Sequence, residues 1–235
     1  MLMKKRWMQK GLLLLLCLFL LTGCAGPEEL ERHVYTEEEV EAFIGYDGAH
    51  IEVLVAYEDI MDTRMALATL VMEGTVLDDG TEAYSPLVKG ESFWNYRTFF
   101  QVRVEEVWFG KAKGKTVTVA YVGKRGEGES KPQKGDRVIL FLSQSRTDDY
   151  YIKTSGMEQT YILNPPDDRL IALHTSRDKW PTFSKEDVRQ EMEECLQRFV
   201  DGTTEYRYEN KVLKRYIDSC RRKEKLQSML PWNWE

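Results

Sequence analysis

Apolar and polar residues alternate between positions 69 and 142, and this pattern constrains the fold of the chain more than any other feature. Side chains that repeat every second residue share one face of a strand. In the run 97–108, Phe100, Val102 and Val104 share such a face. Further strands are expected over 69–77, 115–122, 137–142, 150–153 and 159–163. Five or six short strands at this spacing suggest a small barrel or sandwich.

Three of these strands carry additional information. Val107 is the next core candidate after Val104 but is one residue out of phase, which predicts a β-bulge at Glu105-Glu106. Residues 115–122 place Val117, Val119 and Tyr121 on one side. The run 137–142 is apolar on both faces, so we expect both of its faces to be covered.

The order of four segments within residues 60–165 also carries a resemblance. These segments are Glu73-Gly74-Thr75-Val76, Phe100–Gly110, Thr116–Val119 and Lys134–Leu142. Together they resemble the OB-like barrel domain of many bacterial exported proteins, which is distantly akin to the netrin and metalloproteinase-inhibitor (TIMP) barrel. The expected fold class is therefore α+β, with a small antiparallel OB-like β-barrel of five to six strands. Short N-terminal helices and two C-terminal helices complete it.

The first 24 residues form a separate pattern. Four basic residues precede ten apolar ones at 12–21, a run shorter than the roughly 20 residues of a membrane span. The run ends in Leu21-Thr22-Gly23-Cys24, which resembles the lipobox of bacterial lipoproteins. That resemblance implies a diacylglycerol on the thiol of Cys24 and anchoring at the extracytoplasmic face of the cell membrane. Inhibitors of the TIMP type use a free N-terminal cysteine, so their mechanism is not expected here.

The expected organisation has four parts. Residues 1–23 are the signal peptide, 24–50 an acidic tether with a short helix, 51–165 the barrel domain and 166–235 a linker with a helical pair. Removal of 1–23, which holds four basic and no acidic residues, takes the formal charge from -6 to -10. Such an acidic chain is not expected to bind nucleic acid.

Helices are expected at both ends of the barrel. Thr36 and Glu39 form a capping box for a helix over 37–44, and Asp62 can cap a second helix through Leu67. Ser184 and Asp187 can cap a third helix through about residue 200, and a fourth spans about 210–229. The apolar stripes of these last two helices contain Val188, Met192, Cys195, Leu196 and Phe199, then Leu213, Tyr216, Ile217 and Cys220.

The C-terminal helices leave two questions open. Cys195 and Cys220 either bridge the helices as a disulfide or are two small buried residues, and the sequence does not decide between these. Residues 211–225 hold seven Lys and Arg against Asp218 and Glu224. Such a run is usually a solvated face, and contact with anionic lipid is the alternative.

The candidate binding residues lie in two long connections, 78–96 and 123–135, which antiparallel strands bring to one end of the barrel. These residues are Tyr84, Phe93, Trp94, Tyr96, Lys124 and Arg125. Aromatic rings beside cations can hold a peptide, a sugar or a headgroup. The alternative, which the sequence favours, is that Phe93 and Trp94 fold inward and close the barrel mouth.

Catalytic signals are weak. Gly110–Thr116 is one residue short of a phosphate-binding loop and leads into a strand instead of a helix. The sequence has no G-x-S-x-G or H-E-x-x-H motif and no histidine at metal-ligand spacing. We therefore expect no cofactor and a non-enzymatic binding module for a protein, peptide or glycan at the cell surface. The alternatives are an assembly factor that docks a membrane complex through its C-terminal helices, and an exported hydrolase.

Overall fold

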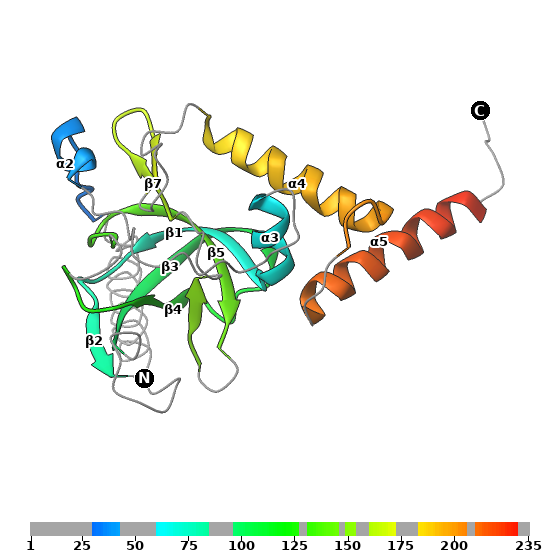
Figure 1. Cartoon of the computed structure of the whole chain (residues 1–235), viewed down its shortest axis with the longest axis horizontal. Helices are drawn as coiled ribbons and strands as arrows, with labels where there is room; N and C mark the ends of the chain where they lie inside the picture. The colour runs from blue at the N-terminus through cyan, green and yellow to red at the C-terminus, as the bar shows by residue number, and fades with distance from the viewer. Residues whose placement is uncertain are drawn as a thin grey trace, which may run out of the picture. The chain divides into compact units, whose positions relative to one another are not determined.

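Five strands close into a barrel, which is the centre of an α+β fold (Figure 1). The computed structural model describes residues 30–42, 60–84, 96–126, 131–145, 149–153, 160–172, 183–205 and 210–229. The helices are α2 (Glu37–Glu41), α3 (Ile60–Leu67), α4 (Lys185–Asp201) and α5 (Lys211–Met229). The strands are β1 (Leu70–Val76), β2 (Thr81–Tyr84), β3 (Tyr96–Gly110), β4 (Thr116–Val122), β5 (Arg137–Gln144), β6 (Tyr151–Lys153), β7 (Tyr161–Asn164) and β8 (Arg169–Ala172).

The barrel follows the order β1-β3-β4-β6-β5, and β5 pairs with β1 to close the ring. All of these pairs are antiparallel except β4–β6, which is parallel. The predicted purely antiparallel barrel is therefore wrong in this detail. The reason is geometric, because directions that alternate around a closed ring cannot match at every seam when the number of strands is odd. A five-stranded ring needs at least one parallel pair.

The long strand β3 contains the predicted irregularity and a second one. Its register against β1 shifts between Glu73 and Gly74, whose partners are Glu106 and Val104, so Glu105 is the extra residue. This confirms the bulge expected at Glu105-Glu106. A second shift leaves Trp108 as another extra residue. The prediction of Val107 as a core residue is consequently wrong: Val107 is 39% exposed, and Phe109 is buried instead.

Two apolar clusters lie on opposite faces of β5, as its sequence predicted. Val138, Leu140 and Leu142 belong to the cluster inside the barrel, together with residues such as Phe100, Val119 and Tyr121. Ile139 and Phe141 belong to a second cluster that includes Met65 of α3 and residues of α4 and α5. The barrel wall therefore has an apolar face on both sides, and the helices cover the outer one.

The helix signals are confirmed with one correction. Both capping boxes form, at Thr36 with Glu39 and at Ser184 with Asp187. Asp62 does not cap α3, because the helix already begins at Ile60. The carboxylate of Asp62 instead pairs with Arg198 of α4. The predicted apolar stripe of α4 is buried throughout, and none of the described helices is long and apolar enough to cross a membrane.

Three elements extend beyond what the sequence predicted or fall outside the structure. The strands β2, which pairs with β3, and β8, which pairs with β7, were not predicted from the sequence. Residues 43–44, the end of the expected first helix, lie outside the described residues. Cys195 is buried, Cys220 is half-buried, and no disulfide joins these two described cysteines.

Two glycines with left-handed backbones, Gly110 at the end of β3 and Gly126 after β4, allow a matched test of packing. Gly110 has φ +80°, and a Cβ there would overlap the carbonyl oxygen of Thr69. Gly126 has φ +77°, and a Cβ there would meet nothing within 4 Å. Gly126→Ala should therefore lower the free energy of unfolding by about 1 kcal/mol through φ strain alone. Gly110→Ala should lower it by about 3 kcal/mol, since backbone overlap is added.

Urea unfolding of the two variants beside the wild-type chain measures both values. Equal losses at the two positions would contradict the close approach of Gly110 to Thr69.

Candidate functional site

Four of the predicted binding residues come together at one end of the barrel. Tyr84 of β2 lies opposite Tyr96 of β3 in the strand register. Their ring centroids are 5.5 Å apart with the rings nearly perpendicular. The ammonium group of Lys124 lies 4.6 Å from the centroid of the Tyr96 ring, a cation–π contact. We call Tyr84, Tyr96, Lys124 and Arg125 the loop-end cluster.

Hydrogen bonds hold the two connections against each other. The backbone N–H of Arg125 donates to Glu82 Oε1 at 2.7 Å, and its guanidinium pairs with Asp79 at 3.2 Å. Gly123 donates its N–H to the carbonyl of Tyr96, and Thr98 donates its hydroxyl to the carbonyl of Gly123. The connection after β4 is therefore fixed to the β2–β3 pair by both backbone and side-chain bonds.

A tight turn places β2 in this position. Asp78 Oδ1 accepts the N–H of Gly80 at 3.1 Å and the N–H of Gln101 at 3.2 Å. Gly80 has φ +80°, which favours glycine. The turn therefore folds the chain back onto β3, and all four residues of β2 are exposed.

The loop-end cluster presents aromatic surface to solvent. Tyr84 is 48% exposed and Tyr96 is 38% exposed. Lys124 and Arg125 bring two positive charges, and Asp79 and Glu82 bring two negative ones, so the formal charge of the group is balanced. Such a surface suits a polar partner with its own hydrogen-bonding groups better than a simple anion. The other two candidates, Phe93 and Trp94, lie outside the described residues.

The connection after β4 ends at a buried acid that the sequence analysis did not single out. Asp136, only 1% exposed, accepts hydrogen bonds at Oδ2 from the Tyr35 hydroxyl and the Gln133 N–H, both at 2.7 Å. Tyr35 is held in turn by Asn164, which exchanges two hydrogen bonds with its backbone. The segment before α2 is thereby attached to the barrel beside the base of this connection.

Burial dominates the electrostatics of Asp136. No described donor reaches its Oδ1 atom. Desolvation raises the pKa of Asp136 to about 6, although the bonds from Gln133 and Tyr35 act in the opposite direction. Burial, followed by the neighbouring Asp136, also raises the pKa of Tyr35. The buried carboxyl therefore changes charge within a mildly acidic range.

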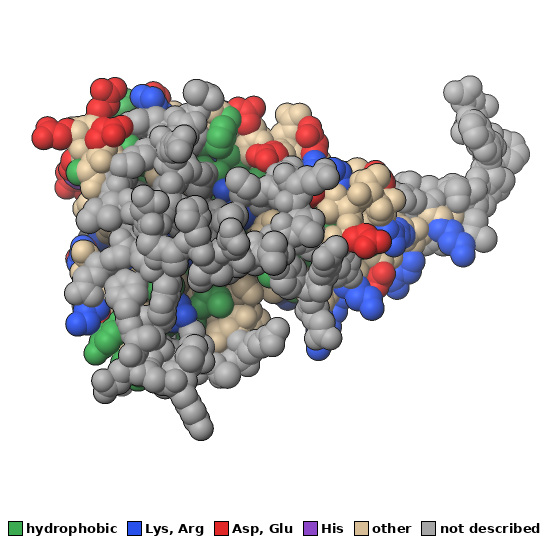
Figure 2. Space-filling model, viewed as in Figure 1, with side chains coloured by type: hydrophobic (Ala, Val, Ile, Leu, Met, Phe, Trp, Pro, Cys, Tyr) green, Lys and Arg blue, Asp and Glu red, His purple; other side chains and the backbone are tan. Residues whose placement is uncertain are grey.

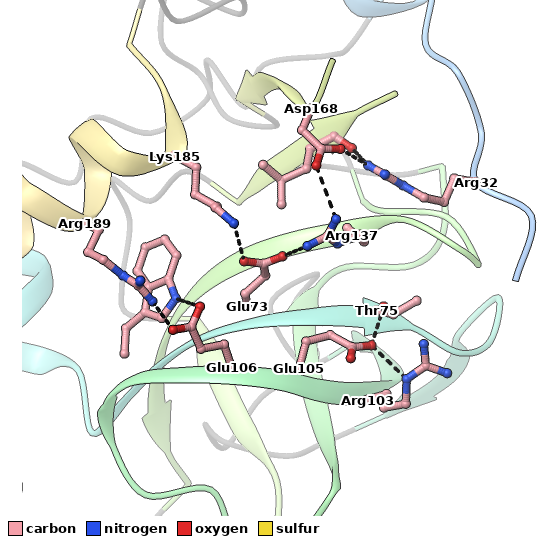
Figure 3. Close-up of polar contacts among 12 residues, drawn as sticks. Arg32, Glu73, Thr75, Arg103, Glu105, Glu106, Arg137, Asp168, Lys185 and Arg189 are labelled. Atoms are coloured by element: carbon pink, nitrogen blue, oxygen red, sulfur yellow. Dashed lines mark hydrogen bonds and ion pairs between the residues drawn. The ribbon is translucent and has the colours of Figure 1, made fainter. Parts of the chain in front are cut away.

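A second group of charged residues lies along the barrel wall and is internally paired (Figure 3). The buried carboxylate of Glu73 in β1 pairs with Arg137 of β5 and with Lys185 of α4, the latter at 3.1 Å. Asp168 joins Arg137 to Arg32 at 3.2 and 2.8 Å. These pairs connect two barrel strands, the β7–β8 turn, the N-terminal segment and α4.

The two acidic residues of the β3 bulge extend this group. Burial by itself raises the pKa of Glu105, but hydrogen bonds from Arg103 and Thr75 lower it overall. The Arg189 guanidinium lowers the pKa of Glu106, and it also lies 4.6 Å from the centroid of the Trp108 ring. Because each carboxylate in the group has a cationic partner, we assign the group a structural role, in which Lys185 and Arg189 hold α4 on the barrel.

A pocket of about 330 Å³ at the opposite end of β3 was missed by the sequence analysis. It lies between α5 and the barrel, and its lining includes Phe109, Tyr151, Tyr216, Lys111 and Arg215. The rings of Phe109 and Tyr216 are in edge contact at 5.7 Å. These residues come from β3 and its end, from β6 and from α5, so no local motif could have indicated the pocket.

Comparisons with known proteins leave the function to these geometric arguments. No protein-family model matches the chain, and no curated protein matches it. Among the described residues, no group of three or more His, Cys, Asp or Glu side chains is arranged to hold a metal ion.

The raised pKa of Asp136 gives a pH-dependent stability. Because its folded pKa of about 6 exceeds the ordinary 3.8, the folded chain holds this proton more tightly than the unfolded chain does. The contribution is fully present below pH 3.8 and is lost as the pH rises through about 6. Between about pH 4 and pH 7 the wild-type chain should lose about 3 kcal/mol relative to Asp136→Asn.

Urea unfolding of both proteins across this range measures the difference, and titration of the Asp136 carboxyl by NMR gives its pKa directly. Parallel stability profiles, with an Asp136 pKa near 4, would contradict the assignment.

Proposed function

We propose that this chain is a lipoprotein anchored at the extracytoplasmic face of the cell membrane, and that its barrel is a non-enzymatic binding module. The anchor is supported by Leu21-Thr22-Gly23-Cys24 and the short apolar run before it. In the proposal, a diacylglycerol on Cys24 holds the chain on the bilayer. At least two acyl chains are needed for stable retention.

The observation that carries the binding function is the loop-end cluster. Two exposed tyrosines stand side by side on a rigid strand pair, and a cation lies over one of them. Tyrosine supplies a large contact area with little loss of side-chain entropy on binding. Such residues dominate protein interfaces when a partner covers them.

The edge of β2 favours a peptide segment of a protein partner over a glycan. Among the described strands, β2 pairs with β3 alone, and the fold does not use its other edge for a barrel seam. An extended peptide can add to such an edge through backbone hydrogen bonds while its side chains contact neighbouring rings. Tyr84 and Tyr96 lie where those contacts would form.

The proposal assigns no catalytic residue and no cofactor. Its support is the pairing of the charged residues in Figure 3, where the carboxylates are occupied by Arg and Lys side chains. A carboxylate held in this way stabilises the fold and is not poised to exchange a proton with a substrate.

The anchor predicts a defined change on Cys24→Ala. The mature wild-type chain should begin at residue 24, carry the mass of a diacylglycerol and remain with the membrane fraction. Cys24→Ala should lack that mass and lose stable retention, because the acyl chains supply the insertion energy. Intact mass spectrometry with membrane fractionation makes the comparison, and Cys17→Ala, within the segment expected to be removed, is the matched control. An unmodified Cys24 would contradict the anchor.

If the loop-end cluster is the binding site, capture of a protein partner should depend on the end of β3 that contains Tyr96. A photo-crosslinking residue at position 82 should join a surface protein partner, and one at exposed position 107 should not. Tyr84→Ser with Tyr96→Ser should reduce the partner's affinity at least tenfold, because both aromatic anchors are removed. Lys111→Ala with Val107→Ala, at the other end of β3, is the control pair. Capture that is equal at both positions, or only of a glycan, would contradict the proposal.

A further inference from the structure

Helix α5 has its apolar side covered by the chain itself. Leu213 and Ile217 are buried in the cluster that contains α3 and α4, and Val212 and Cys220 pack against its edge. Arg221 bonds to the carbonyls of Val200 and Phe199, at 2.7 and 3.3 Å, where α4 ends. Any partner of α5 must therefore meet the side of the helix that points away from the barrel.

That outward side is cationic. The residues Lys211, Lys214, Arg215, Arg222 and Lys225 are exposed, and we call them the cationic face. At about 100° per residue they fall within an arc of roughly 100° on the helix, and their span along it is about 21 Å. Asp218 is the one acid in that arc. Figure 2 shows blue side chains gathered along α5.

The cationic face differs from the other charged regions in having few internal partners. Within the part of the chain that the structure describes, no carboxylate pairs with Lys211, Lys214, Arg215 or Arg222. Like charges three and four residues apart on a helix repel, as Lys211 does with Lys214 and Arg215. The exposed side of α4 instead carries acids such as Glu193 and Glu194. The arrangement therefore does not serve the stability of α5.

We propose that the cationic face docks on the anionic headgroups of a lipid bilayer. Charge complementarity favours this occupant, because the whole chain has formal charge -6, yet five exposed cations lie together on one side of α5. An anionic surface would attract that side and repel the acidic remainder, which fixes the orientation of the domain. This inference rests on the proposed lipoprotein function, because an anchored chain keeps α5 near the bilayer at high effective concentration.

The pocket at the barrel end adjoins this face. Arg215 belongs to both, and Lys111 adds a further cation to the lining. Tyr216, which is exposed between them, is of the amphipathic type that favours the headgroup region of a bilayer. Docking would therefore place aromatic and cationic groups together at the lipid surface.

The test uses the mature chain without its anchor, beginning at Ala25, so that only surface binding is measured. This chain retains the compact unit from Arg32 onward. We expect it to sediment with vesicles of phosphatidylcholine mixed with phosphatidylglycerol at low salt, and not with phosphatidylcholine alone. Lys211→Gln with Lys214→Gln should weaken the partition roughly 30-fold, since each cation near an anionic surface contributes about fivefold.

Two matched variants complete the design. Lys115→Gln with Lys134→Gln removes the same charge from exposed positions elsewhere and should partition like wild type. Lys211→Arg with Lys214→Arg keeps the charge and should also bind. Circular dichroism checks that all variants fold, as expected for exposed positions.

Three results would overturn the inference. These are equal weakening by both Lys→Gln pairs, equal binding to neutral vesicles, and binding to a soluble polyanion such as polyphosphate without binding to anionic vesicles. The chain in the vesicle experiment begins at Ala25 and lacks Cys24. The absence of lipidation on Cys24 and the absence of vesicle binding by α5 would therefore be distinguishable results.

Discussion

The buried carboxylate of Glu73 is the interaction on which the arrangement of the whole molecule depends. It lies in β1, the strand that pairs on both sides to close the barrel, and it is 2% exposed. Its partners, Arg137 and Lys185, come from the neighbouring strand and from α4. Loss of both cations would leave buried charge without compensation, a destabilisation of about 3–5 kcal/mol. The position of α4 on the barrel, and of α5 beyond it, is thereby tied to one side chain.

Charged side chains in this protein fall into two groups with different physical roles. Those along the barrel wall range from buried to partly exposed, alternate in sign and pair with one another, so they add specificity to the packing of α4. Those on α5 are exposed and mostly positive. The loop-end cluster is intermediate, since its cations contact a ring or a carboxylate while its tyrosines face solvent. Charged side chains that pair with one another thus stabilise the fold. The exposed charged and aromatic side chains of α5 and the loop-end cluster form the surfaces at which partners are proposed to bind.

Much of the fold was predictable because its signals are local. Periodicity two located the barrel strands, the phase change after Val104 located the bulge at Glu105, and the capping boxes located two helix starts. The meeting of Tyr84 and Tyr96 with Lys124 and Arg125 followed from alternating strand directions alone. The parallel β4–β6 pair did not, because it arises only when the ring closes. The second bulge, at Trp108, could not be predicted because it lies within a run of large apolar residues that shows no change of phase. The pocket could not be predicted because its lining comes from segments far apart in the sequence.

The parallel seam has a consequence for how the ring behaves mechanically. β4 and β6 are joined by two registered residue pairs, whereas β1–β3 and β3–β4 have seven each. A closed ring is expected to open first at the seam with the fewest residue pairs. All five strands would then form a continuous open sheet in the order β6-β5-β1-β3-β4. Solvent would enter the barrel interior beside Tyr151 and Val119 with the loss of few backbone bonds. The barrel is therefore closed, but its weakest seam lies at β6, the last of its five strands along the chain.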